Sequence, residues 1–282
     1  MAELSKSLAT KREQLLELLT GYGRCAVAFS GGVDSAVVAQ AAQLALRDGA
    51  VAVTGTSDAL AAGELEAARD LAARIGIRHI VISTEEFANP DYVANKADRC
   101  YHCKTELYSQ LGRMRERLGV SAVVNGANAD DLGDYRPGLK AANEQDVLSP
   151  LAECGLTKQE VRQLAAAWDL PVADKPATPC LSSRVAYGLN VTPERLDRFD
   201  QAEQFLRSLG FNELRVRLHA DDMARIEVPV SEVGKLCEPN ARGSIVAEFE
   251  RLGFKFVTLD LAGFRSGGFT KLVPSEMLTR FA

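Results

Sequence analysis

Long hydrophobic runs are missing from this sequence, and so is any excess of positive charge. No segment approaches the ~20 consecutive apolar residues that span a membrane. The first part of the chain lacks the apolar core of a signal peptide, because charged side chains are spread through it. Lysine and arginine number 33 against 38 aspartates and glutamates, which gives a net charge of −5. We therefore expect a cytoplasmic protein with no membrane partner and no overall attraction to nucleic acid.

Cysteine is sparse, since six in 282 residues are too few for a disulfide-stapled scaffold. Wholesale disorder and a collagen-like fibre are also excluded, because 46% of the residues are hydrophobic and 25% are charged, as in an ordinary globular protein. The length suits two unequal domains or one large domain. In a reducing compartment the cysteines become candidates for chemistry or metal binding rather than crosslinks.

The first two thirds of the chain alternate between short apolar runs and helical patterns. This alternation predicts an α/β fold, a mostly parallel sheet with helices on both faces in a Rossmann-like arrangement. Ligands of such sheets bind at the carboxyl ends of the strands, where the strand order reverses. The expected strands are 25–29, 50–54, 79–82 and 121–124, and the expected helices are 4–19, 36–46, 64–75 and 103–118.

The pattern changes after residue 124 and again near residue 187. Between these points we expect a polar loop over residues 125–143, then a helix over 157–168 that begins with a capping box of Thr157 and Glu160, then Pro-rich irregular chain over 171–179. Two later strands follow each other without a helix between them, which predicts an antiparallel pair in a smaller α+β domain. The predicted domains are 1–187 for the first sheet and 188–282 for substrate binding or oligomerisation. In the second domain we expect helices at 193–209 and 241–252 and strands at 213–219, 225–228 and 255–261.

A short loop with two glycines, Ser30-Gly31-Gly32-Val33-Asp34-Ser35, joins the first predicted strand to the next helix. The glycines let backbone N–H groups approach an anion, and the helix N-terminus adds the positive end of its dipole. Asp34 suits an anion site only if Mg²⁺ lies between its carboxylate and the phosphates. The loop matches neither the Walker lysine motif nor a dinucleotide-binding turn. We predict a phosphate-binding loop, with a plain capped turn as the alternative.

A second polar segment, residues 125–138, follows the fourth predicted strand and should lie at the same end of the sheet. It supplies Gly126, the acidic pair Asp130 and Asp131, and the basic residue Arg136. Aspartate oxygens at this place would hold Mg²⁺ or orient a nucleotide. A solvated loop of turn residues is the alternative, and the segment's position favours the functional interpretation.

Three of the six cysteines have surroundings that indicate chemistry. Cys100 and Cys103 form a Cys-x-x-Cys at the start of a predicted helix, where the dipole should lower the thiol pKa values. This pattern fits a redox pair, half of a zinc site or part of an iron–sulfur site. Cys180 lies in an irregular segment with positive neighbours, which predicts a reactive thiol. The other cysteines, at positions 25, 154 and 237, are expected to be structural.

If the three thiols converge, their chemistry depends on the fourth position. A structural zinc would need one more ligand, for which His102 is a weak candidate because it lies on the same short turn. A [4Fe–4S] cluster held by three cysteines would instead keep one iron free for an external ligand, an arrangement that suits catalysis.

These motifs together resemble the LarE family of ATP-dependent sulfur transferases within the PP-loop, or adenine nucleotide α-hydrolase, superfamily. The resemblance covers nearly the whole chain and rests on residues 30–35, 125–138, 179–184 and the pair Arg215 and Arg217. It implies that ATP with Mg²⁺ adenylates a carboxylate of pyridinium-3,5-biscarboxylic acid mononucleotide and releases pyrophosphate. A sulfur nucleophile then displaces AMP, and two rounds give the dithio product for a nickel-pincer nucleotide. The family also implies a homo-oligomer, expected to be a hexamer.

The family exists in two forms that differ in their sulfur source. In one, a cysteine that matches Cys180 gives up its own sulfur and the enzyme acts once. In the other, that cysteine and a matching Cys-x-x-Cys bind a [4Fe–4S] cluster whose free iron carries a sulfide, from a donor that the sequence does not identify. This chain has all three positions, Cys100, Cys103 and Cys180, so we expect the cluster form.

The resemblance also assigns roles to the individual side chains of the motifs. Cys180 and Asp34 are the expected catalytic residues. The substrate is expected to contact Arg136, Ser182, Arg184, Arg215 and Arg217, and ATP with Mg²⁺ is expected to contact Ser30, Gly31, Gly32, Val33, Asp34, Ser35, Gly126, Asp130 and Asp131.

Three other functions share the phosphate loop. A tRNA-thiolating enzyme would need a basic RNA surface, against which the net charge of −5 argues. An ammonia-dependent ligase of the NAD or GMP synthetase type would have no need of the three cysteines. A regulatory module would bind nucleotide and release no pyrophosphate with any substrate.

Overall fold

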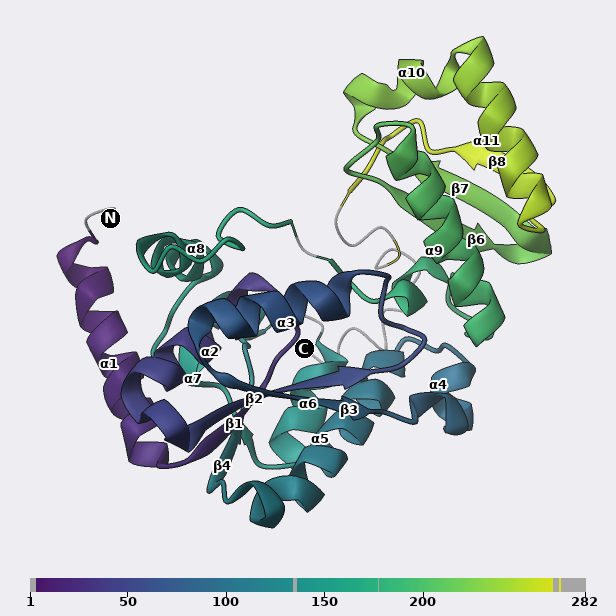
Figure 1. The fold of residues 1–282 in the computed structure, drawn as a ribbon. Helices are drawn as coiled ribbons and strands as arrows, with labels where there is room; N and C mark the ends of the chain where they lie inside the picture. Colours follow the sequence, from purple (N-terminus) through teal and green to yellow (C-terminus); the bar gives the residue numbers. More distant parts are fainter. Residues whose placement is uncertain (1–3, 134–135, 177, 266–268, 270–282) are drawn as a thin grey trace.

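A computed structural model describes residues 4–133, 136–176, 178–265 and 269 of the chain. Its larger sheet is parallel throughout, in the order β3-β2-β1-β4-β5, as Figure 1 shows from one side. The α/β fold predicted from the alternating pattern is therefore confirmed. The strands are β1 (Cys25–Ala28), β2 (Ala50–Thr56), β3 (Arg78–Ser83), β4 (Ala122–Val124) and β5 (Val147–Leu148).

Helices cover both faces of this sheet because its strands carry apolar side chains on both sides. Cys25 and Val27 of β1 pack in one core, whereas Ala26, which lies between them, packs in another. The first core includes α1 (Lys6–Tyr22), α2 (Val33–Leu46), α3 (Glu64–Ile75), α7 (Pro150–Glu153) and α8 (Lys158–Ala167). The opposite core includes α5 (Arg99–Leu118) and α6 (Pro137–Glu144).

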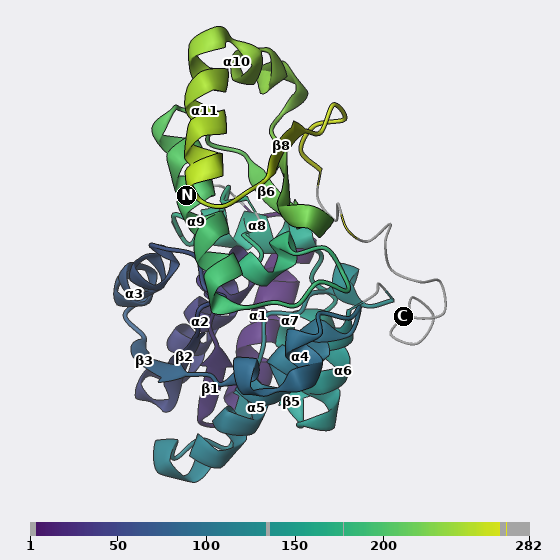
Figure 2. The same ribbon diagram turned by 90° about the vertical axis from the view of Figure 1, so that its right-hand side faces the viewer.

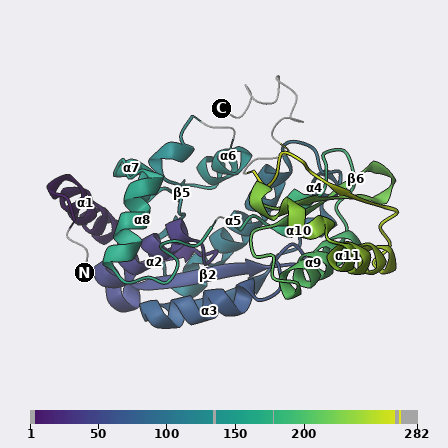
Figure 3. The same ribbon diagram turned by 90° about the horizontal axis from the view of Figure 1, so that it is seen from above.

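The smaller sheet has the order β6-β7-β8 and lies apart from the larger sheet, as Figures 2 and 3 show from two directions. The short helix α4 (Pro90–Val93) contacts α5. The expected antiparallel pair is confirmed: Arg215 pairs with Glu227, and Arg217 with Arg225. The third strand runs parallel to its neighbour. The elements are α9 (Pro193–Ser208), β6 (Arg215–His219), β7 (Met223–Glu227), α10 (Val233–Cys237), α11 (Pro239–Arg251) and β8 (Phe256–Leu259).

Several elements differ from the sequence prediction at residues 125–148. The expected loop 125–143 contains a 3-10 turn, η3 (Ala129–Asp131), and the start of α6, whose first residue is a proline that suits a helix start. Strand β5 was not predicted, because two residues carry no periodic signal. Further 3-10 turns are η1 (Arg47–Gly49), η2 (Glu86–Ala88), η4 (Leu181–Arg184), η5 (Ala220–Asp222) and η6 (Val230–Glu232).

The two sheets are joined by a buried junction. Ala59 and Tyr92, from the first part of the chain, pack in the core formed by α9 and β6. Asn95 is fully buried and donates its side-chain N–H groups to the carbonyls of Val185, Ala186 and Leu189. The connecting chain is therefore held from both sides. In the described part of the chain, no helix has both the length and the apolar character needed to cross a membrane.

Candidate functional site

The loop that follows β1 has the geometry of an anion cradle. Gly31 has a φ of 72°, and a Cβ there would lie 3.3 Å from the Cβ of Ala68, so glycine is required. Ser30 donates its backbone N–H to Oγ of Ser35 at 3.2 Å, and that hydroxyl donates to the carbonyl of Gly32 at 3.0 Å. The N-cap of α2 is Gly32, which has no side chain to occupy the N–H groups of the first turn. These groups point where phosphates would bind.

The second polar segment lies directly against this loop. A Cβ at Gly126 would lie 2.8 Å from the backbone nitrogen of Ser35 and 3.1 Å from Cβ of Asp34. The contact occurs between β1 and β4, where the strand order reverses. The two motifs predicted to form a nucleotide site are therefore brought together at the ligand-binding position of this fold class.

Asp34 lies at the centre of a polar network. Its Oδ1 accepts a hydrogen bond from the Asn128 amide at 3.1 Å, and its Oδ2 lies 2.5 Å from Nζ of Lys158. The backbone N–H of Lys158 donates to Asp130 at 2.8 Å. The ammonium of Lys158 therefore faces the Asp34 carboxylate, where the sequence predicts Mg²⁺. Carboxylate oxygens of Asp34 and Asp130 fit this hard cation as ligands.

The sequence did not identify Lys158 or Asn128 as residues of this site. Lys158 follows the Thr157 cap at the first position of α8, and the predicted capping box with Glu160 is confirmed. A lysine there opposes the helix dipole, which is the signal that could have marked it as functional. Arg136, which was expected to contact substrate, forms an ion pair of 2.6 Å with Asp131.

The Cys-x-x-Cys lies in the first turn of α5, as predicted, but the expected effect on pKa is wrong for Cys103. Burial raises the pKa of the Cys103 thiol to about 12; Lys104 lowers it, and Cys180 and Cys100 raise it further. The thiol packs against the core of the smaller domain, and this burial outweighs the helix dipole. Cys100 and Cys180 are both exposed. The electrostatic effects of Cys100 and Cys180 on Cys103 place the three thiols in one neighbourhood.

The donor set has the chemistry that an iron–sulfur cluster needs, since it offers three free thiols near the cations Arg99 and Lys104. Among the described residues, however, no three Cys, His, Asp or Glu side chains are gathered in a metal-binding arrangement. Cys25 is buried on β1, as predicted, whereas Cys237 is exposed and does not pack as expected.

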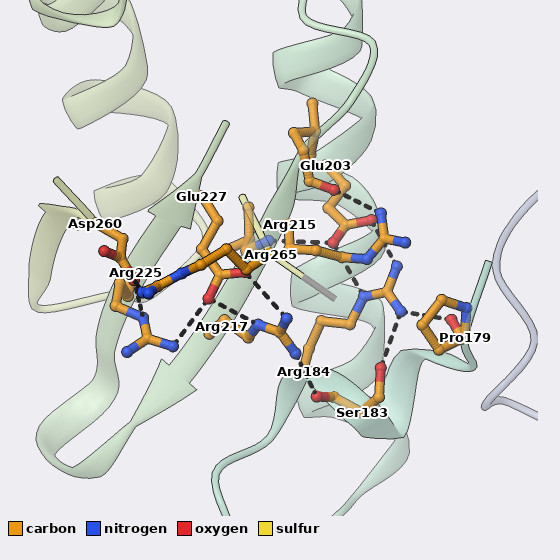
Figure 4. Close-up of polar contacts among 12 residues, drawn as sticks. Pro179, Ser183, Arg184, Glu203, Arg215, Arg217, Arg225, Glu227, Asp260 and Arg265 are labelled. Atoms are coloured by element: carbon orange, nitrogen blue, oxygen red, sulfur yellow. Dashed lines mark hydrogen bonds and ion pairs between the residues drawn. The ribbon is translucent and has the colours of Figure 1, made fainter. Parts of the chain in front are cut away.

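Buried arginines surround the segment that carries Cys180, as the close-up in Figure 4 shows in part. Arg184 is completely buried and pairs with Glu203 through Nε and Nη2, at 3.0 and 3.1 Å. Burial alone would raise the pKa of Glu203, but the charge and hydrogen bonds of Arg184 lower it. Ser182 is also completely buried, and its hydroxyl lies 2.7 Å from the Tyr92 hydroxyl. Glu203 was another residue that sequence reasoning missed.

Arg215 and Arg217 lie at alternate positions of β6, next to this segment (Figure 4). Burial lowers the pKa of Arg215 to about 10, and the like charge of Arg184 contributes. Arg217 pairs with Glu227 at 3.0 Å, and its guanidinium lies 4.8 Å from the ring centre of Phe269. Among the residues that the structure describes, the ion pairs of this cluster join the arginines 184, 207, 217, 225 and 265 to the three carboxylates of residues 203, 227 and 260. The cluster therefore favours an anionic ligand.

Comparisons with known proteins agree with this geometry. The sequence model of the asparagine synthase family matches residues 17–206. An uncharacterized protein of Synechocystis sp. is 45% identical over 266 residues, 94% of this chain and 99% of its own length. The pyridinium-3,5-bisthiocarboxylic acid mononucleotide synthase of Lactiplantibacillus plantarum is 38% identical over 278 residues, 98% of this chain and 99% of the relative.

A more distant match covers about half of the chain. The tRNA-specific 2-thiouridylase of Azorhizobium caulinodans is 32% identical over 192 residues, which is 54% of this chain and 49% of that protein. The similarity to it therefore spans about half the length of each protein.

Proposed function

The chain belongs to the LarE-like branch of the PP-loop, asparagine-synthase-type adenine nucleotide α-hydrolases, and on this premise we propose that it is an ATP-dependent sulfur transferase. Its proposed substrate is pyridinium-3,5-biscarboxylic acid mononucleotide. One observation carries the proposal: the exposed Cys180 thiol lies in a segment that is bonded to Arg217 of β6, in a chain that also has a phosphate loop. One chain would thus activate a carboxylate with ATP, supply a thiol for sulfur transfer and bind an anionic substrate.

The first half-reaction is assigned to the phosphate loop. The backbone N–H groups at the start of α2, with the hydroxyls of Ser30 and Ser35, would bind the phosphates of ATP. Asp34 and Asp130 would hold Mg²⁺, which neutralises charge on the phosphates when it is bound. An oxygen of the substrate carboxylate attacks the α-phosphorus, the bond to the β-phosphate oxygen breaks, and pyrophosphate leaves. The carboxylate becomes an acyl adenylate with AMP as its leaving group.

The second half-reaction belongs to the Cys180 segment and to β6. Arg215 and Arg217 would bind the substrate phosphate by charge-assisted hydrogen bonds, which fixes the activated carboxylate near the thiols. A sulfur nucleophile attacks the acyl carbon, the bond to the AMP oxygen breaks, and a thiocarboxylate forms. A second round on the other carboxylate gives the dithio product.

We propose that Cys100, Cys103 and Cys180 hold a [4Fe–4S] cluster, which when bound supplies a sulfide on its free iron. The alternative is that Cys180 gives up its own sulfur and becomes dehydroalanine. The presence of three free thiols in one neighbourhood supports the first form. A cytoplasmic location and a hexameric assembly are part of the same proposal, and sedimentation of the purified protein tests the assembly.

The test is turnover by anaerobically purified protein with ATP, Mg²⁺, sulfide and the biscarboxylic acid mononucleotide. Pyrophosphate release and thiocarboxylate formation are measured together, along with bound iron and the mass of the Cys180 peptide. The proposal expects both products, bound iron and an unchanged Cys180. Iron-free protein whose Cys180 is converted to dehydroalanine would support the sacrificial form, and pyrophosphate release without sulfur transfer would refute both.

A second candidate function is tRNA thiolation, which the similarity to the 2-thiouridylase of Azorhizobium caulinodans favours. It predicts that the protein binds tRNA at physiological salt and thiolates it, which a filter-binding assay and nucleoside analysis would detect. An ammonia-dependent ligase is separated from both by the Cys100→Ala, Cys103→Ala, Cys180→Ala triple variant. This variant would keep ligase activity and would lose every sulfur-transfer activity.

A further inference from the structure

The peptide carbonyls around Cys180 are held by guanidinium groups rather than by regular secondary structure. Arg184 donates to the carbonyls of Pro179 at 2.5 Å and of Cys180 at 3.0 Å. Arg99 donates to the carbonyl of Ser182 at 2.7 Å. Arg217 donates to the carbonyl of Ser183 at 3.0 Å, as Figure 4 shows. The three arginines are buried, which strengthens each of these charge-assisted bonds.

Arg184 is the member of this set that touches Cys180 itself. Its side chain is fully buried, and its nitrogen atoms donate to the two carbonyls and to both oxygens of Glu203. A planar fork that is bonded along one edge to a carboxylate cannot turn without breaking two parallel bonds. The guanidinium is therefore a fixed support for the peptide of Cys180.

Glu203 connects this support to the strand that carries the proposed substrate arginines. Its Oε1 accepts the backbone N–H of Val216 at 3.1 Å, and Val216 lies between Arg215 and Arg217 on β6. One carboxylate on α9 thus bonds both to the arginine beneath Cys180 and to the backbone of β6. The position of the thiol and the position of the bound substrate share one anchor.

From this geometry we infer that Arg184 is a positioning residue for Cys180. Glu203 holds the Arg184 side chain in a fixed position relative to β6. The inference rests on the proposed sulfur transfer, and it gives Arg184 a different task from the substrate contact expected from the family resemblance. Arg184 acts through the peptide of Cys180, which it keeps where sulfur can reach the activated carboxylate. We place adenylation at the phosphate loop, whereas the bonds of Arg184 among the described residues go to Glu203 and to the Cys180 segment.

The test separates the two half-reactions in the full-length protein with Arg184→Lys. Lysine keeps the positive charge but cannot form the bidentate pair. ATP–pyrophosphate exchange in the presence of the biscarboxylic acid mononucleotide is expected to stay within about twofold of wild type, whereas thiocarboxylate formation falls at least about tenfold. A purely structural role would lower both rates together. Equal losses in both rates, or normal sulfur transfer, would overturn the inference.

Arg198→Lys is the matched control. Arg198 lies on α9, the helix of Glu203, and like Arg184 it bonds a carboxylate, that of Asp222 at 3.1 Å, and a backbone carbonyl, that of Gly253 at 2.6 Å. Its contacts among the described residues are with Asp222, Gly253 and Phe254, away from the Cys180 segment. We expect Arg198→Lys to leave the ratio of the two half-reaction rates unchanged.

Hydrogen–deuterium exchange of the substrate-free protein makes the test independent of the proposed activity. The N–H groups of Leu181 and Ser183 donate to the carbonyls of Ala59 and Cys180 in the folded segment. Arg184→Lys is expected to speed exchange in the peptide that covers these residues by about tenfold, and Arg198→Lys is not. If wild-type protein shows no sulfur transfer, the proposed function fails while this measurement still decides the positioning role. If Arg184→Lys does not fold, Glu203→Asp serves as the second variant, and unchanged exchange in it would overturn the inference.

Discussion

At the scale of single residues, the contact between Asp34 and Lys158 determines how the nucleotide site is charged. The ammonium of Lys158 lies 2.5 Å from the carboxylate, and Asn128 bonds the other oxygen. A lysine in this place compensates the negative charge that would otherwise repel phosphates. If Asp34 binds Mg²⁺ as proposed, this ammonium would become available to the departing pyrophosphate.

We therefore predict that Lys158→Met slows pyrophosphate release on the order of 10- to 100-fold at saturating ATP, the usual size of a lost electrostatic contact in the transition state. Lys140→Met is the control, because Lys140 lies on α6 with an exposed side chain 3.9 Å from Glu144. The measurement is steady-state release of pyrophosphate for both variants. Similar rates for wild type and Lys158→Met would show that the lysine only stabilises the apo loop.

Residue-scale prediction from the sequence worked where the signal was local. The phosphate loop and its glycines were recognisable because the backbone requirement lies within six consecutive residues, and Gly31 has the positive φ that this turn needs. Glu203 was not recognisable, because an acidic residue on a helix is usually solvated and only the buried partner Arg184, distant in sequence, makes it important. The raised pKa of Cys103 was missed for the same reason, since the core that buries it comes from the smaller domain.

At the scale of elements, the site depends on how closely two loops approach. The loop after β4 lies against the N-terminus of α2 at Gly126, where any side chain would meet the backbone of Ser35. This close approach keeps the acidic segment within reach of the phosphates. A change here acts on the packing of two elements rather than on a functional group.

We predict that Gly126→Ala destabilises the protein by about 1–3 kcal/mol, as overpacking usually does, and raises the KM for ATP. The matched control is Gly234→Ala on α10, where a Cβ would meet nothing within 4 Å. That variant should be neutral or more stable by up to about 1 kcal/mol, since alanine favours a helix. Urea unfolding and ATP titration of both variants check the prediction, which fails if Gly126→Ala binds ATP normally.

Long elements were predicted well from the sequence, and short ones were not. The helix Glu64–Ile75 has the residues expected from its periodic pattern, because twelve residues give several repeats of an amphipathic face. Strand β5 has two residues, and its place in the sheet is set by pairing with β4 rather than by its own composition. Helix α6 lay in a segment whose glycines and aspartates indicate a loop.

At the scale of the whole molecule, Glu203 links the stability of the fold to pH. Its side chain is 1% exposed and pairs with the fully buried Arg184. Its pKa is lower in the folded protein than the ordinary value of 4.5, so the unfolded chain takes up a proton at a higher pH than the folded one. The stabilisation by this carboxylate is therefore fully present above pH 4.5 and is lost as the pH falls through the lowered folded pKa.

We predict that Glu203→Gln lowers the free energy of unfolding by about 3–5 kcal/mol at pH 7, because Arg184 is left as a buried charge without its partner. The difference between wild type and variant should shrink once the pH drops below the ordinary pKa of glutamate. Urea unfolding at several pH values from neutral to acidic measures this difference. A constant gap over the whole range would contradict the assignment.

The domain boundary predicted from the sequence does not separate the hydrophobic cores of the folded protein. The change of sequence pattern near residue 187 predicts one domain over residues 1–187 and another over residues 188–282. Leu181 and Val185, on the first side of that boundary, pack with α9 and β6 of the second. Sequence patterns mark where elements change, but shared cores arise from contacts between segments that are distant in the chain.

The arginines around Cys180 bond to residues that are synthesised later than Cys180 itself. Arg184 needs Glu203, and Arg217 needs Glu227, so the carbonyls beside the thiol have their final partners only after β7 has been synthesised. When Cys100 and Cys103 have just left the ribosome, the residues that surround the three thiols in the native fold have not all been synthesised. The bond between Arg99 and Ser182 spans 83 residues, and contacts over such sequence distances form late in folding. The native surroundings of the three thiols are therefore complete only after most of the chain has been synthesised.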